Sequence, residues 1–249
     1  MTKVLIHGNP ETDAIWHRLV TALGKRGIDD VVTLSPPGFG SPVPAGWSAT
    51  QTAYRDWLIA ELEAIAKPID LVAHDWGAAH VFGVIAHRPE LVQSWAADCV
   101  GLIAPDYVWH DMAQAWQTPA VGEQVIAAMV DTALVDRTKM LVDLGIPAAT
   151  AADIAPAMDA TMGECVLRLY RSAVQPAMSQ LGSRLLDHDL PPGRAIIALD
   201  DPYIGSIDNS VVTAHRLGAD TITLDGLGHW WMFEGADRVA DALVEFWHT

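Results

Sequence analysis

The chain has 249 residues, enough to form one domain around a single large hydrophobic core. Its 31 acidic residues outnumber its 15 basic ones, and the resulting formal net charge of −16 repels nucleic acid and anionic membrane surfaces. Although 51% of the residues are hydrophobic, no apolar run approaches the roughly 18 residues that span a bilayer. These properties favour a small, uncharged and apolar ligand.

The N-terminal residues run directly into a predicted strand and lack the charged and apolar regions of a signal peptide, so we expect a cytoplasmic protein. Cys99 lies in an apolar strand-like run and Cys165 in a helix-like run, and both are expected to be buried free thiols. Nothing in the sequence indicates a cofactor or determines the oligomeric state.

Short apolar runs alternate along the chain with longer segments in which apolar residues recur every three or four positions. We predict strands at residues 3–6, 30–34, 69–74, 92–100, 194–199 and 221–224. Helices are predicted between them, for example at residues 16–25, 53–66 and 78–87. This alternation is typical of an α/β fold with a mostly parallel, doubly wound sheet.

The alternation stops between residues 102 and 193, where we find no convincing strand and expect several short helices. This segment holds six of the eight methionines, whose flexible side chains fill cores and also line adaptable pockets. We therefore predict a core formed by residues 1–101 and 194–249, with residues 102–193 inserted as a helical cap.

The first predicted strand ends in His7-Gly-Asn-Pro10. A doubly wound sheet places this loop beside the loop that follows the third strand. The backbone N–H groups of Asn9 and Trp76 are therefore candidates for an oxyanion hole. His7 itself is expected to have a structural role.

The third predicted strand ends at Asp75, and a helix begins at Trp76-Gly77. A sharp turn between strand and helix, with small residues such as Ala73 and Gly77 around it, is typical of a nucleophile elbow. The turn would hold the carboxylate near the helix N-terminus, whose dipole favours an anion. A helix-capping role for Asp75 is the alternative. Because no Gly-x-Ser-x-Gly occurs, an ordinary serine esterase is disfavoured.

The last two predicted strands lead into an acid and a histidine, in the order that follows a nucleophile in a catalytic triad. Asp201 lies further beyond its strand than Asp200, so we predict that Asp201 orients His229. No metal site is predicted, because His74 and His80 lack a third ligand at a suitable spacing.

Three motifs resemble those of haloalkane dehalogenases and epoxide hydrolases, two groups of the α/β-hydrolase superfamily. They are His-Gly-Asn-Pro at 7–10, His-Asp-Trp-Gly at 74–77 and Gly-His-Trp at 228–230. The resemblance spans nearly the whole chain and implies an α/β-hydrolase fold with a helical cap. We expect the sheet to lack the first two strands of those families.

The resemblance implies two different roles for the residues around Asp75. In dehalogenases, residues corresponding to Asn9 and Trp76 hold the leaving halide. The segment Leu169-Tyr-Arg-Ser172 resembles the epoxide hydrolase motif whose tyrosine protonates the opening epoxide, which makes Tyr170 a candidate acid. Glu11 after Pro10 also resembles epoxide hydrolases.

Two further residues remain as alternatives. Tyr107 is the only other tyrosine of the predicted cap, and a structural role is expected for it. Asp98 is a rival to Asp201, because one dehalogenase branch takes its acid from the end of the strand before the cap.

We therefore expect a hydrolase that forms an alkyl ester on Asp75, with His229 activating the water that hydrolyses this ester. Hydrolytic dehalogenation of a small haloalkane is the favoured reaction. Hydrolysis of an epoxide to a diol is the alternative. A non-catalytic small-molecule receptor on the same fold is the third hypothesis.

Overall fold

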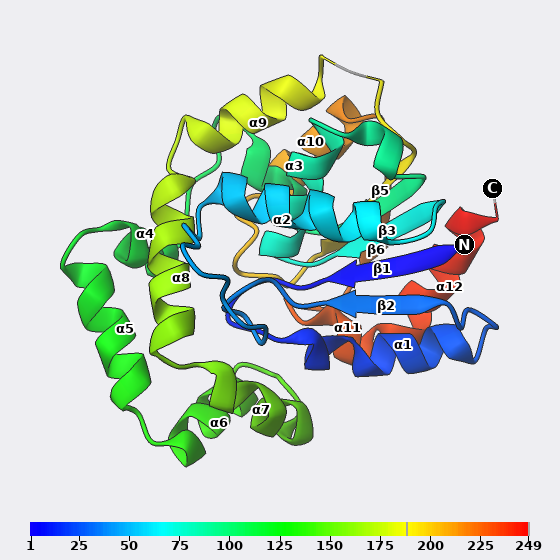
Figure 1. Cartoon of the computed structure of the whole chain (residues 1–249). Helices are drawn as coiled ribbons and strands as arrows, with labels where there is room; N and C mark the ends of the chain where they lie inside the picture. Colours follow the sequence, from blue (N-terminus) through cyan, green and yellow to red (C-terminus); the bar gives the residue numbers. More distant parts are fainter. Residues whose placement is uncertain (188, 249) are drawn as a thin grey trace.

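The computed structural model describes residues 1–187 and 189–248. Its centre is a parallel sheet in the order β2-β1-β3-β4-β5-β6 (Figure 1). The strands are β1 (Thr2–Ile6), β2 (Val31–Leu34), β3 (Ile69–Ala73), β4 (Ser94–Ala97), β5 (Gly193–Ala198) and β6 (Asp220–Leu224). The predicted α/β fold with a parallel sheet is confirmed, and β1 is the strand that leads into His7.

The direction in which strands are added reverses between β1 and β3, which are neighbours in the sheet with Ile6 paired to Ala73. The loops after these two strands therefore leave the same edge of the sheet side by side, where ligands bind in doubly wound folds. All residues of β1 and β3 are buried, as expected for central parallel strands covered on both faces.

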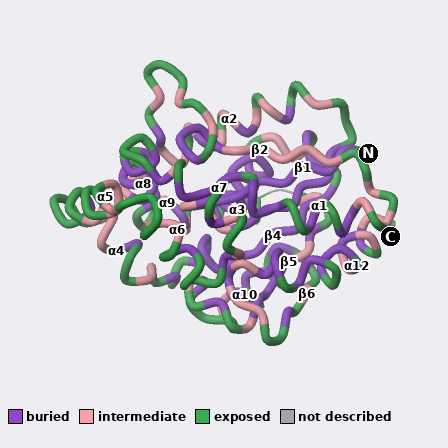
Figure 2. Tube along the Cα trace, turned by 90° about the horizontal axis from the view of Figure 1, so that it is seen from below, coloured by how far each residue is buried: buried purple, intermediate pink, exposed green. Residues whose placement is uncertain are grey.

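Helices cover both faces of the sheet (Figure 1). One face carries α1 (His17–Gly24), α11 (Trp231–Glu234) and α12 (Ala236–Trp247), and the other carries α2 (Gln51–Ala64), α3 (Trp76–Ile85) and α10 (Ile207–Arg216). Short 3-10 turns lie at η1 (Asp13–Trp16), η2 (Pro89–Leu91), η3 (Val100–Ile103) and η4 (Ala155–Ala157). Burial is concentrated along the central strands β1, β3, β4 and β5, whereas the edge strands β2 and β6 are more exposed (Figure 2).

The fourth strand is shorter than predicted. It ends at Ala97 instead of residue 100, because Cys99 has a φ of 50°, a left-handed conformation that a strand does not continue through. Asp98 is thereby left at the carboxyl end of β4, where its side chain accepts a hydrogen bond from the backbone N–H of Asp75 at 2.8 Å. Cys99 and Cys165 are both buried free thiols, as predicted.

Between β4 and β5, the segment from residue 111 to 185 consists of helices and turns, all of it within the described part of the chain. The helices are α4 (Asp111–Gln117), α5 (Val121–Asp131), α6 (Leu134–Asp143), α7 (Ala148–Ile154), α8 (Ala160–Ser172) and α9 (Ala177–Leu185). Figure 1 shows α4 to α8 grouped beyond the carboxyl ends of the strands, whereas α9 contacts α3. That residues 102–193 form one cap remains our proposal.

Among the described residues, none of the helices has both the length and the apolar character that a bilayer crossing requires.

A buried ion pair and a hydrogen bond join the three neighbouring strands β1, β3 and β4. Lys3 Nζ of β1 lies 2.5 Å from Asp70 Oδ2 of β3, and Ser94 of β4 donates to Asp70 Oδ1 at 2.5 Å. The two charged side chains are only 5% and 2% exposed. Removal of one partner leaves the other charge buried and uncompensated.

We expect Asp70→Ala to lower the free energy of unfolding by about 3–5 kcal/mol, measured by urea denaturation. The matched control is Asp143→Ala, which breaks an ion pair whose partners are 70% and 61% exposed. The control should cost less than about 1 kcal/mol, because exposed pairs contribute little. Equal losses in the two variants would contradict a structural role for the buried pair.

Candidate active site

The backbone at Asp75 is strained in the manner of a nucleophile elbow. Asp75 has φ 52° and ψ −122°, a region that non-glycine residues rarely occupy. Two glycines allow the close approach of the chain around it. A Cβ at Gly77 would overlap the carbonyl of Ile6, and a Cβ at Gly8 would overlap the Asp75 carboxylate itself. The turn thus holds the carboxylate against the loop that follows β1.

The structure brings Asn9 to Asp75, as the adjacency of β1 and β3 predicts. The backbone N–H of Asn9 donates to Asp75 Oδ1 at 2.9 Å. The side-chain amide of Asn9 donates to the Tyr170 hydroxyl over a long 3.5 Å, while Asn9 Oδ1 is buried without a hydrogen-bond partner among the described residues. Asn9 therefore contacts both the predicted nucleophile and the predicted cap acid.

Tyr170 lies in α8 and reaches the same point. Its ring meets the ring of Trp76 edge to face, with centroids 5.0 Å apart. Burial raises the pKa of Tyr170 well above its usual value, although hydrogen bonds from Trp76 and Asn9 to its oxygen act in the opposite direction. The two side chains expected to hold a halide thus converge on the Tyr170 hydroxyl.

His229 and Asp201 also form the pair that was predicted. Nδ1 of His229 lies 2.8 Å from Asp201 Oδ2, and the two side chains are 4% and 1% exposed. The other carboxylate oxygen of Asp201 accepts from the backbone N–H of Tyr203 at 2.8 Å. With Nδ1 held by a carboxylate, the opposite nitrogen of His229 is left as the acceptor of a proton.

Asp98, the rival to Asp201, binds a different histidine. Its Oδ2 lies 2.5 Å from Nδ1 of His74 and accepts from the indole of Trp231 at 2.7 Å. Its Oδ1 is taken by the backbone N–H of Asp75. In this structure the acid at the end of β4 therefore supports the elbow, and not His229.

Glu11 completes this arrangement from the loop after β1. Its Oε1 lies 3.1 Å from Nε2 of His74 and accepts from the Trp230 indole at 2.5 Å, while Oε2 accepts from the Gly8 N–H at 3.3 Å. In the sequence, Glu11 stands out only for its position after Pro10, and no catalytic role is predicted for His74. The sequence did contain one indication of this arrangement, because acids follow several of the strands whose ends lie side by side.

A small enclosed cavity of about 20 Å³ lies beside Asp75, with room for about one water molecule. Aromatic rings predominate in its lining: Asp75, Trp76, Cys99, Leu102, Tyr107, Trp109, His110, Tyr170, Tyr203 and Ile204. The hydroxyl of Tyr107 donates to the backbone carbonyl of Tyr203 at 3.0 Å, which agrees with a structural role.

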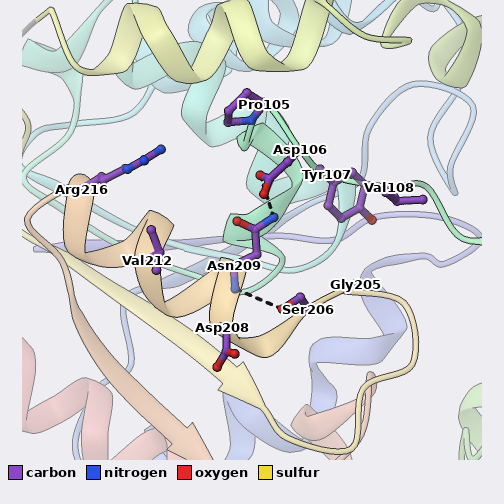
Figure 3. A pocket seen from close by; sticks show the side chains of 10 residues that line it. All are labelled: Pro105, Asp106, Tyr107, Val108, Gly205, Ser206, Asp208, Asn209, Val212 and Arg216. Atoms are coloured by element: carbon purple, nitrogen blue, oxygen red, sulfur yellow. Dashed lines mark hydrogen bonds between the residues drawn. The ribbon is translucent and has the colours of Figure 1, made fainter.

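A much larger groove of about 700 Å³ lies on the outer side of Tyr107 (Figure 3). Figure 3 shows it bounded by α10 and by the segment from Pro105 to Val108. Tyr107 lines both the groove and the small cavity, so this residue lies between the surface and Asp75.

The titration of the site is shaped by burial. Burial raises the pKa of Asp75 to about 6, although His229 and the Asn9 N–H favour its charged form. For His229, burial and the nearby His74 lower the pKa, but Asp201 and Asp75 outweigh them and leave it above its usual value. Burial raises the pKa of Cys99 well above its usual value, so this thiol is not a competing nucleophile.

Among the residues that the structure describes, two groups of three side chains are close enough together to hold a metal ion. Glu11, His74 and His229 form one, and Cys99, Asp201 and His229 form the other, with ligand atoms within 4.8 Å in each group. The sequence spacing did not reveal either group. Both nitrogens of His74 and Nδ1 of His229 already face carboxylates, so an ion would have to replace protons that these hydrogen bonds hold.

Comparison with known proteins shows a similarity in sequence to a dehalogenase. A haloalkane dehalogenase of Mesorhizobium japonicum is 29% identical over 138 residues, an alignment that covers 50% of this chain and 42% of that protein. The matched part is thus less than half of the relative's length.

Solved structures with a similar fold cover almost the whole chain. A haloalkane dehalogenase from Bradyrhizobium elkani superposes with a TM-score of 0.75 at 22% identity, covering 98% of this chain and 89% of that one. A bromoperoxidase from Bacillus anthracis gives a TM-score of 0.74 at 18% identity, covering 100% and 92%. At these identities the likeness is one of fold. The sequence profile of the alpha/beta hydrolase family matches residues 4–242, and the chain therefore belongs to that family.

Proposed function

We propose that the protein is a hydrolase in which Asp75 attacks a saturated carbon and forms an alkyl ester, which water activated by His229 then hydrolyses. The observation that carries this proposal is the position of the Asp75 carboxylate, half-buried at the elbow with Oδ1 2.9 Å from the Asn9 N–H. In the proposed reaction, Oδ1 is the oxygen that becomes the oxyanion beside the Asn9 N–H, and Oδ2 attacks the substrate.

The second half of the reaction uses His229. Water attacks the ester carbonyl carbon of Asp75, His229 accepts the water's proton, and the alcohol product leaves with Oδ2. Asp201, 2.8 Å from Nδ1, stabilises the imidazolium that forms. The backbone N–H of Asn9 stabilises the charge that develops on Oδ1.

Dehalogenation of a small haloalkane is the reaction that we favour. A departing halide needs hydrogen-bond donors in a dry pocket, and the Asn9 amide and the Trp76 indole converge on one point beside Asp75. The relative from Mesorhizobium japonicum, which carries the name haloalkane dehalogenase, supports the same proposal. A halide at that point would have to displace the Tyr170 hydroxyl.

Epoxide hydrolysis is the second candidate, and Tyr170 is the observation that favours it. Its oxygen accepts hydrogen bonds from Asn9 and Trp76, which leaves its own hydrogen free to be donated. A buried hydroxyl in that position can protonate the oxygen of an opening epoxide.

The size of the cavity restricts the substrate in either case. A space of about 20 Å³ must enlarge by movement of its aromatic lining before a ligand enters. We propose that small unbranched substrates enter past Tyr107 from the groove in Figure 3.

His229→Gln should trap the alkyl ester, because the variant retains the nucleophile and loses the base. After incubation with 1,2-dibromoethane, mass spectrometry should show added mass on the peptide that contains Asp75. The control is His215→Gln, the same substitution at an exposed position of α10, and it should turn over without accumulating the adduct. An unmodified peptide in His229→Gln, with a wild-type enzyme that releases bromide, would remove the covalent mechanism.

Asn9→Ala and Tyr170→Phe distinguish the two leaving groups. For a dehalogenase, Asn9→Ala should slow halide release by about 10²-fold, the effect of losing one donor, while Tyr170→Phe should retain or increase it. For an epoxide hydrolase, Tyr170→Phe should instead slow diol formation from styrene oxide by about 10²-fold. The rates are measured with both substrates, and halide release that Asn9→Ala leaves unchanged would contradict the favoured reaction.

The rate of adduct formation should fall as the pH falls through about 6, because burial raises the pKa of Asp75 to about 6 and only the charged carboxylate attacks. Below that pH the rate should drop about tenfold per unit. Rapid-quench measurement of adduct formation in the wild-type enzyme provides the profile. A rate constant that stays level down to pH 4.5 would show that Asp75 is not the attacking group with this pKa.

A further inference from the structure

The site contains a second buried histidine with acidic partners, which the proposed mechanism does not use. His74 is fully buried and precedes the nucleophile in the chain. Its Nδ1 lies 2.5 Å from Asp98 and its Nε2 lies 3.1 Å from Glu11. Asp201 pairs with His229 alone, so the site holds two histidines with separate sets of carboxylates.

The hydrogen bonds determine the protonation of His74. A carboxylate only accepts hydrogen bonds, so a histidine with a carboxylate at each ring nitrogen must carry a proton on both. Glu11 and Asp98 are themselves held as acceptors by N–H groups of Gly8, Trp230, Asp75 and Trp231. Burial lowers the pKa of His74, but Asp98 and Glu11 outweigh it and raise the pKa well above the usual value.

This imidazolium lies directly against the predicted base. The ring centroids of His74 and His229 are 4.5 Å apart, with the planes tilted by 53°. At that separation inside the protein, a second positive charge on His229 is repelled. The titratable groups that face His229 from the elements around it are Glu11, His74, Asp75, Asp98, Cys99, His110, Asp201 and Tyr203.

The four carboxylates of this set, Glu11, Asp75, Asp98 and Asp201, outnumber its two imidazoles, His74 and His110. Without a cation at His74, three buried carboxylates and the half-buried Asp75 would surround His229 and favour its protonated form, which cannot act as a base. The positive charge of His74, whose ring centroid is 4.5 Å from that of His229, offsets part of the effect of these carboxylates on His229. Hydrolysis of an ester on Asp75 depends on neutral His229.

We propose that His74 is a positioning residue, an imidazolium held between Glu11 and Asp98 whose positive charge opposes protonation of the adjacent His229 and so increases the fraction of His229 that is neutral and available as a base. This role rests on the proposed function of His229, but the charge state of His74 does not. The two parts can therefore be tested separately.

The charge state is tested in the wild-type protein without substrate, by two-dimensional proton–nitrogen NMR of the histidine rings from pH 5 to 9. We expect one ring, assigned to His74 by its loss in His74→Gln, to remain protonated on both nitrogens to pH 8 or above. A neutral His74 ring at pH 7 would overturn the proposal, whatever reaction the enzyme catalyses.

The effect on His229 is tested by the pH dependence of single-turnover ester hydrolysis. His74→Gln removes one positive charge, which makes protonation of His229 more favourable. The acid limb of the profile should therefore shift to higher pH by about one unit, and hydrolysis at pH 6.5 should slow about tenfold. His74→Gln combined with Glu11→Gln removes one charge of each sign, and the limb should return to within a few tenths of a unit of the wild-type position.

The double variant separates charge from structure. If His74 only bridges two loops, the loss of Glu11 as well should weaken the site further and leave the limb displaced, which would overturn the proposal. An unmoved limb in His74→Gln would do the same. Adduct formation on Asp75 is followed in each variant, so that failure of the covalent mechanism in the wild type is recognised separately from failure of the role of His74.

Discussion

The position of one carboxylate determines the arrangement of this site. Asp75 lies at a φ of 52°, a strained value for a residue with a side chain, and Gly8 and Gly77 leave the room that the end of β1 and its following loop need to approach this turn. The Asn9 N–H and the Asp98 carboxylate then fix the two ends of the residue, one at the side chain and one at the backbone. The neighbouring loops are arranged around this strained residue.

Burial of so many ionisable groups is unfavourable unless each has a partner. The site meets this requirement because its carboxylates are divided between the two histidines. Asp201 holds His229, while Glu11 and Asp98 hold His74. Trp230 and Trp231, which follow His229 in the chain, donate to Glu11 and Asp98 respectively. The loop that carries the predicted base is thus tied to the loops after β1 and β4 by hydrogen bonds with charged acceptors, which are the strong ones.

Much of this architecture follows from local sequence pattern, because strand and helix periodicities, the elbow and the positions of Asn9 and His229 depend on residues close together in the chain. The early end of β4 could not be predicted from this pattern. Cys99 adopts a left-handed conformation, which residues with a side chain rarely adopt. The contact between Glu11 and His74 could not be predicted either. Several acids and histidines lie near the ends of adjacent strands, and the sequence does not say which of them pair. The same holds for Tyr170, whose contact with Asn9 depends on how α8 packs.

Isotope labelling of the first turnover tests the role of Asp75 most directly. With enzyme in excess over substrate in water enriched in oxygen-18, attack on the ester carbonyl should place the label in the Asp75 carboxylate. The alcohol formed in that turnover should carry unlabelled oxygen from Asp75 Oδ2. Labelled alcohol from the first turnover, together with an unlabelled Asp75 peptide, would show that water attacks the substrate directly and would contradict the covalent intermediate.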